Sequence, residues 1–84
     1  MIYSLQIKAS AAKTLKRIDR KERVRLIEAI DRLRTEPTAG SALKGEFAGL
    51  RRLRVGNYRI VYEVIHAELR VLVVRIGHRG SVYR

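Results

Sequence analysis

The sequence predicts an α+β fold: an N-terminal strand, a helical hairpin, and then a three-stranded antiparallel meander. The hydrophobic spacing is helical over most of residues 11–33 and changes to a period of two after Gly49. Gly56 and Asn57 stand between two alternating runs, which is the signal of a two-residue hairpin turn. We therefore expect a single domain over residues 1–84, in which a four-stranded, mostly antiparallel sheet carries both helices on one face.

The N-terminal half supplies one strand and two helices. Residues 2–8 alternate imperfectly between apolar and polar, which predicts the first strand. A helix is expected over residues 11–18 with Ser10 as its N-cap. Asp19 is expected to cap a second helix, with Glu22 at capping-box spacing. The apolar stripe of that helix comprises Leu26, Ile27, Ile30 and Leu33.

The Gly56-Asn57 turn fixes a register for the strands around it. Val55 then lies opposite Tyr58, and Arg54 lies opposite Arg59. Side chains alternate between the two faces of a strand. The face expected under the helices comprises Leu53, Val55, Tyr58, Ile60, Tyr62 and Val64. The other face comprises Arg52, Arg54, Arg59, Val61 and Glu63.

The last strand, over residues 69–76, is apolar on both sides, which favours a central place in the sheet. A turn near His66 and Ala67 would place Glu63 opposite Arg70 on the arginine-bearing face. That register also predicts which apolar side chains stand among the arginines. They are Val61, Leu72, Val74 and Ile76.

The composition restricts the classes of function. Nineteen basic residues against eight acidic ones give a net charge of +11. This excess favours a polyanionic partner such as nucleic acid, the ribosome or an acidic protein, and the alternative is a basic surface that is simply solvated. There is no cysteine, no apolar run long enough to span a membrane and no signal-peptide pattern, so we expect a cytoplasmic protein without membrane contact. Neither His66 nor His78 has a partner at zinc-like spacing, so no metal or other cofactor is expected.

Opposed arginines repel one another across a strand pair, so a sheet that carries them is expected to bind an anion. We interpret that anion as an RNA phosphate, because the arginine fork suits phosphate and keeps its charge. RNA supplies its own nucleophile, the 2′-hydroxyl, and such a cleavage needs positioning and proton transfer but no metal. His78 and Tyr83 are candidates for proton transfer, and Tyr83 could also stack on a base. The alternatives are a histidine without a role and a terminal aromatic that packs on the sheet edge.

In these residues the chain resembles the RelE/ParE toxin superfamily of bacterial and archaeal toxin–antitoxin systems. The resemblance covers nearly the whole chain. It rests on the strand and helical hairpin, on residues 43–45, on residues 52–62 and on the closing segments 76–79 and 82–83.

The resemblance implies a RelE-like mRNA interferase, which cleaves messenger RNA in the ribosomal A site and leaves a 2′,3′-cyclic phosphate and a 5′-hydroxyl. It implies that Arg59, Arg79 and Tyr83 are catalytic. It also implies an RNA-binding set of Lys44, Arg51, Arg52, Arg54 and His78. Arg52 and Arg54 stand where well-studied members have lysines. Because arginine hardly deprotonates, the general base must come from Tyr83, His78 or the ribosome.

The resemblance further implies a small acidic antitoxin as partner. This antitoxin would cover the half-apolar arginine face in a toxin–antitoxin hetero-oligomer. Two other functions are compatible with the same sequence. One is a ParE-like inhibitor of DNA gyrase, because a shared fold does not fix function. The other is a catalytically weak module that binds RNA or the ribosome, which would be marked by tight, salt-dependent binding without cleavage.

Overall fold

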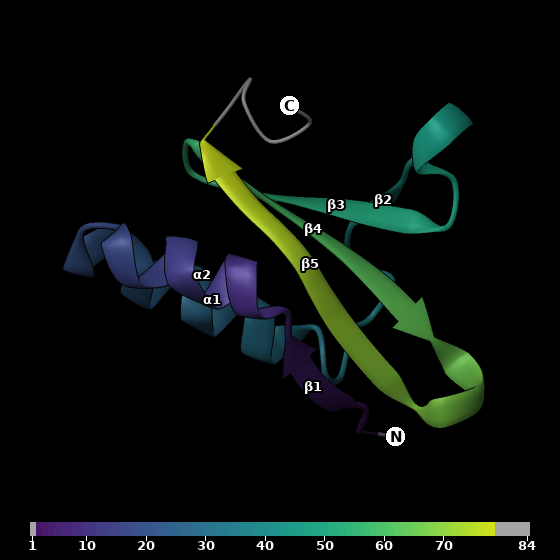
Figure 1. Cartoon of the computed structure of the whole chain (residues 1–84). Coiled ribbons are helices and arrows are strands. Elements are labelled where there is room, and N and C mark those ends of the chain that lie inside the picture. Colours follow the sequence, from purple (N-terminus) through teal and green to yellow (C-terminus); the bar gives the residue numbers. More distant parts are fainter. Residues whose placement is uncertain (1, 79–84) are drawn as a thin grey trace.

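The structure, a computed structural model, describes residues 2–78, which form one mixed sheet with two helices against it (Figure 1). The helices are α1 (Ala9–Arg17) and α2 (Arg20–Arg32). The strands are β1 (Ser4–Ile7), β2 (Ser41–Ala42), β3 (Leu50–Val55), β4 (Tyr58–Ile65) and β5 (Arg70–His78). Two 3-10 turns, η1 (Gly45–Phe47) and η2 (His66–Glu68), connect strands. The sheet order is β1-β5-β4-β3-β2, in which β1 runs parallel to β5 and all other neighbours are antiparallel.

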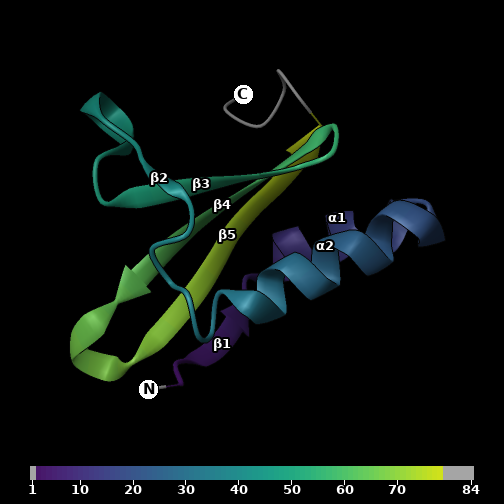
Figure 2. The same cartoon turned by 180° about the vertical axis from the view of Figure 1, so that it is seen from behind.

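The predicted α+β class, the antiparallel meander β3-β4-β5 and the central place of β5 are confirmed. Both helices lie on the same side of the sheet, as Figure 2 shows from behind. The prediction of four strands was wrong, because residues 2–78 contain a fifth strand, β2, at the edge of β3. A strand of two residues is too short to show an alternating pattern.

Helix α1 begins before the predicted position, so the prediction of Ser10 as its N-cap was wrong. Lys8 occupies the N-cap position, without a side-chain hydrogen bond, and Ser10 lies within the first turn. The reason is that β1 runs directly into α1. The Lys8 amide donates to the Val73 carbonyl of β5, and the Lys8 carbonyl accepts the first helical bond from Ala12.

Helix α2 has Asp19 at its N-cap position as predicted, although no side-chain hydrogen bond caps the helix there. Three of the four predicted stripe residues are fully buried. They are Leu26, Ile30 and Leu33. The prediction for Ile27 was wrong, because its side chain is 49% exposed. Successive helical residues lie about 100° apart, so Ile27 lies beside the buried stripe of Leu26, Ile30 and Leu33 rather than on it.

The β3–β4 hairpin has the register predicted from Gly56 and Asn57, with Val55 opposite Tyr58 and Arg54 opposite Arg59. The predicted helix-side residues of the hairpin are confirmed as core residues or as residues packed on the core. The buried cluster joins the two helices to the sheet. It contains Ala11, Ile18, Leu26, Ile30, Leu33, Ile60, Tyr62, Val71, Val73 and Ile76.

The predicted β4–β5 register was wrong by two residues. Glu63 lies opposite Leu72, and Arg70 lies opposite Ile65. The connection is longer than a two-residue turn, because η2 is followed by Leu69 in the left-handed conformation with φ 50°. No glycine marks this turn in the sequence, so the local pattern did not reveal its length.

Strand β5 contains one extra residue, Val74, where its pairing with β4 shifts. The pairs on either side of the shift are Tyr62 with Val73 and Val61 with Arg75. A bulge of this kind reverses the alternation of all residues beyond it. Ile76 therefore joins the core, so its predicted place on the arginine-bearing face was wrong, and Arg75 takes that face instead.

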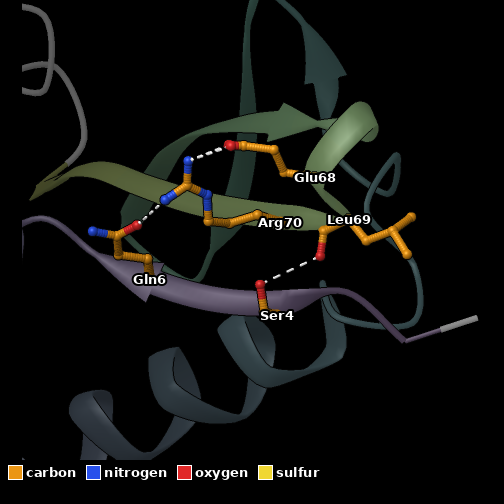
Figure 3. A network of polar contacts seen from close by, with 5 residues as sticks. All are labelled: Ser4, Gln6, Glu68, Leu69 and Arg70. Atoms are coloured by element: carbon orange, nitrogen blue, oxygen red, sulfur yellow. Dashed lines mark hydrogen bonds and ion pairs between the residues drawn. The ribbon is translucent and has the colours of Figure 1, made fainter.

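Arg70 ties three elements together at the end of the sheet remote from the hairpin turn (Figure 3). Its guanidinium donates to the side chain of Gln6 in β1 at 2.7 Å and pairs with Glu68 in η2. The Ser4 hydroxyl donates to the Leu69 carbonyl at 3.4 Å. These contacts hold the edge strand β1 and the η2 turn to β5. Within residues 2–78, no helix is long and apolar enough to cross a membrane.

Candidate nucleic-acid interface

The side of the sheet turned away from α1 and α2, which we call the open face, carries two rows of side chains near the β3–β4 turn. The row nearest the turn comprises Arg54, Arg59 and Gly77. The next row comprises Ser41, Arg52, Val61 and Arg75. Four arginines thus lie in two adjacent rows. Among the described residues, the first acidic side chain on this face is Glu63, one row farther from the turn.

Arg54 and Arg59 line a pocket of about 260 Å³ at the end of the hairpin, together with Gly56, Asn57 and Tyr58. We call it the hairpin pocket. Within residues 2–78, the side chain of neither arginine forms a hydrogen bond or an ion pair, so both guanidinium groups keep their full donor capacity. Gly77 lies on the other side of Arg59 and contributes no side chain there. The pocket can therefore accept an anion between two arginine forks.

Val61 shows how the arginines pack on the open face. It is only 3% exposed, yet it does not belong to the core cluster on the helix side. Its neighbours in the row are Arg52 and Arg75. We infer that their aliphatic stems cover Val61.

Of the residues predicted to bind RNA, the structure brings together Arg52 and Arg54 with the predicted catalytic residue Arg59. Lys44 is exposed and lies between β2 and η1, beyond these two rows. Arg79 and Tyr83 lie outside the described residues.

Arg51 and His78 do not line the hairpin pocket, although His78 is adjacent to its lining residue Tyr58. Arg51 is opposite Tyr62 on the helix side, and its guanidinium donates to the carbonyls of Gly40 at 3.0 Å and Thr38 at 3.2 Å. The His78 ring meets the ring of Tyr58 edge-on, with centroids 5.3 Å apart. Arg51 therefore anchors a loop, and His78 packs beside an aromatic ring.

Arg75 is the open-face arginine that sequence reasoning missed. Without the bulge, Arg75 would fall on the helix side and Ile76 on the open face. The signal was present in the sequence, because that regular register would have buried a charge and exposed an isoleucine.

The loop before β2 is held against β3 and β4 by the buried Tyr62. The Tyr62 hydroxyl accepts a hydrogen bond from the Gly40 amide at 2.9 Å and donates to the Pro37 carbonyl at 2.8 Å. Arg51 binds the same loop through its guanidinium. This loop, residues 37–40, therefore has a fixed position beside Arg52.

Tyr62→Phe is expected to lower the free energy of unfolding by about 1–3 kcal/mol, because it leaves the buried Gly40 amide without its partner. Urea denaturation would measure the change. Tyr3→Phe is the matched control, because the Tyr3 hydroxyl bonds the exposed His66 at 2.8 Å and water can replace it. Equal losses in the two variants would contradict the anchoring role of Tyr62.

Within the described part of the chain, no group of three or more His, Asp or Glu side chains is arranged to hold a metal ion. What the open face offers is permanent positive charge with planar hydrogen-bond donors. Such groups neutralise a phosphate and stabilise negative charge that grows on it during a reaction.

Comparison with known proteins identifies the family of this chain. The family model for the ParE toxin of the type II toxin–antitoxin system parDE matches residues 5–83. The chain is 31% identical over 84 residues to the toxin RelE of Mycobacterium tuberculosis, covering 98% of this chain and 87% of that protein. The chain belongs to the RelE/ParE toxin superfamily. The resemblance drawn from the sequence motifs is thereby confirmed.

Other members of the superfamily match along their whole length. The toxin RelG of M. tuberculosis is 29% identical over 86 residues, covering all of this chain and 99% of that protein. The RelBE2 toxin–antitoxin complex of M. tuberculosis contains a chain with a TM-score of 0.88 and 26% identity, covering 94% of this chain and 100% of that one. The archaeal RelE–RelB complex of Pyrococcus horikoshii contains a chain with a TM-score of 0.80 and 25% identity, covering 98% and 100%. The RelE/ParE fold of this chain is thus supported by solved relatives.

Proposed function

We propose that this protein is the toxin of a type II toxin–antitoxin pair and acts as a ribosome-dependent endoribonuclease on mRNA. The observation that carries the proposal is the hairpin pocket, where Arg54 and Arg59 face one another on the open face without an acidic neighbour in either of the first two rows. Like charges directly opposed across a strand pair are unfavourable by themselves. A bound phosphate removes that repulsion, which supports a polyanionic substrate.

In the proposed reaction, the 2′-oxygen of the RNA attacks the adjacent phosphorus, and the bond from phosphorus to the 5′-oxygen breaks. The products are a 2′,3′-cyclic phosphate and a 5′-hydroxyl. Arg59 stabilises the charge that develops on the phosphate oxygens, and Arg54 holds the phosphate from the opposite strand. A base removes the 2′-proton and an acid protonates the leaving oxygen. We assign further charge stabilisation to Arg79 and proton transfer to Tyr83, as the family resemblance implies.

We further propose that a small acidic antitoxin binds this toxin and covers the open face. The relatives in the M. tuberculosis and P. horikoshii structures are bound in RelB–RelE toxin–antitoxin complexes, which supports a partner of this kind. The open face offers such a partner both charge and apolar area. Leu72 and Val74 are half-buried there and lie outside the core cluster.

A second candidate function is inhibition of DNA gyrase, which is favoured by the match of residues 5–83 to the ParE family model. This candidate is a binding function and requires no pocket for a scissile phosphate. The opposed arginines of the hairpin pocket support the ribonuclease instead, because they fit a single phosphate group.

Induction of the protein in cells, followed by mapping of mRNA 5′ ends, separates the two candidates. The ribonuclease proposal expects new 5′-hydroxyl ends within translated messages, and their absence after induction of Arg59→Ala. Intact mRNA together with accumulated cleaved DNA–gyrase complexes would overturn the proposal in favour of gyrase inhibition. Growth arrest with neither product would leave ribosome or RNA binding without cleavage as the function.

A further inference from the structure

We propose that Ser41, Arg52 and Arg54 form a second phosphate-binding subsite, so that the RNA strand leaves the hairpin pocket across β3 toward β2. This inference rests on the proposed function, because it takes RNA as the ligand. It gives the short edge strand β2 a direct part in substrate binding.

A second pocket at the edge of β3, beside the start of β2, provides the space. It has a volume of about 500 Å³ and is lined by Ala39, Gly40, Ser41, Arg52, Leu53 and Arg54. Arg54 also lines the hairpin pocket, so the two pockets adjoin. Residues two apart on one strand are separated by about 6–7 Å. This is comparable to the distance between successive phosphates of a nucleic acid strand, so one phosphate fits each row.

The chemistry of the second pocket suits a phosphate group of RNA. Ser41 lies directly opposite Arg52, and side chains at such positions start about 5 Å apart on the same face. The serine hydroxyl can donate to a phosphate oxygen that the Arg52 fork also binds. Within residues 2–78, no carboxylate lines this pocket, and the side chains of Arg52 and Arg54 form no hydrogen bond or ion pair.

The β2 side of this pocket is held in place before any ligand binds. The Gly40 amide is fixed by the Tyr62 hydroxyl, and its carbonyl is bound by Arg51. Gly40 also lies so close to Arg52 that a Cβ atom would stand 2.6 Å from the Arg52 carbonyl oxygen. Because this side of the pocket is already ordered, RNA binding costs little additional conformational entropy there.

The test compares two serines at equivalent edge positions, of which Ser4 differs in donating to the Leu69 carbonyl at 3.4 Å. Ser41 and Ser4 are both exposed, both lie in an edge strand on the open face, and both are opposite an arginine. Ser4 faces Arg70, which is already paired with Gln6 and Glu68 at the far end of the sheet. Ser41→Glu and Ser4→Glu therefore change the net charge equally, but only Ser41→Glu places a carboxylate in the proposed subsite.

The probe is a single-stranded RNA oligonucleotide whose 2′-hydroxyls are methylated, so that it binds but cannot be cleaved. Its Kd is measured by fluorescence anisotropy at several salt concentrations. Ser41→Glu is expected to weaken binding more than 10-fold and to lower the salt slope by about 0.7, the contribution of one phosphate contact. Ser4→Glu is expected to weaken binding about 2-fold with an unchanged slope. Ser41→Ala, which removes only the hydroxyl, is expected to weaken binding about 3-fold.

Equal Kd values and slopes for Ser41→Glu and Ser4→Glu would overturn the subsite, and so would Ser41→Ala binding as tightly as wild type. Cleavage of translated mRNA by wild type is measured separately. A wild-type protein that shows the expected binding pattern but never cleaves would overturn the ribonuclease and leave the subsite standing. A wild-type protein that does not bind the oligonucleotide would overturn the subsite.

Discussion

Arg59→Ala is expected to lower the rate of mRNA cleavage by a factor of about 10² to 10³. Arg59 lies opposite Arg54 and has Gly77 on its other side, and its side chain forms no hydrogen bond or ion pair within residues 2–78. An alanine would leave the hairpin pocket open but without the charge that we propose stabilises the reacting phosphate. Single-turnover cleavage of a ribosome-bound mRNA, over a range of toxin concentrations, would separate lost affinity from lost chemistry.

Arg17→Ala is the control for the loss of one positive charge. Arg17 is exposed in the last turn of α1, on the opposite side of the sheet from the hairpin pocket. We expect it to change the cleavage rate less than 2-fold. Arg59→Ala should change the free energy of unfolding by less than about 1 kcal/mol, because it also removes repulsion from Arg54. Cleavage by the Arg59→Ala protein at the rate of the Arg17→Ala protein would exclude Arg59 from the reaction.

Gly40→Ala is expected to lower the free energy of unfolding by about 2–3 kcal/mol. Its added Cβ atom would stand 2.6 Å from the carbonyl oxygen of Arg52 and 2.8 Å from the hydroxyl of Tyr62. The first of these atoms belongs to the backbone of β3 and cannot rotate away. The loop would have to move off the sheet, and the buried hydrogen bond from the Gly40 amide to Tyr62 would be lost with it.

Gly45→Ala separates the effect of space from the effect of backbone conformation. Gly45 has a positive φ of 68° but nothing within 4 Å of an added Cβ atom, so it should cost only about 1 kcal/mol. Urea denaturation of both variants would compare the two costs. If Gly40→Ala is no more destabilising than Gly45→Ala, the close approach of Gly40 to β3 does not constrain the fold.

The register of a strand pair could be predicted from the sequence where the residues of its turn identify the turn type. Gly56 and Asn57 adopt a turn that few other residue pairs accept, so they fixed the β3–β4 register and with it the pair Arg54–Arg59. The turn between β4 and β5 contains Leu69 in the left-handed conformation, which a sequence pattern does not announce. The bulge at Val74 lies in a strand that is apolar on both sides, where alternation does not mark an extra residue, so its only sign is the phase of Arg75 and Ile76.

The same distinction holds for the candidate site. Arg52, Arg54 and Arg59 could be placed from alternation alone, because all three lie on the two strands of the hairpin. Arg75 could not, because it lies beyond the bulge. The place of Ser41 on the open face was also not predicted. The strand β2 is recognised only by its pairing with β3, in which Ser41 lies opposite Arg52. The contribution of β2 to the open face is therefore a property of the folded chain.

The parallel pairing of β1 with β5 has a consequence for how the chain folds. The first strand of the sequence pairs with the last, so that Ser4 lies beside Arg70. The β3–β4 hairpin, by contrast, closes through two residues and can form early from neighbouring segments. During synthesis, β1 has no partner until β5 has been made, and its edge and apolar side chains stay uncovered until then. The arginine hairpin can thus form before the sheet is complete, and we expect the closure of β1 onto β5 to be a late step of folding.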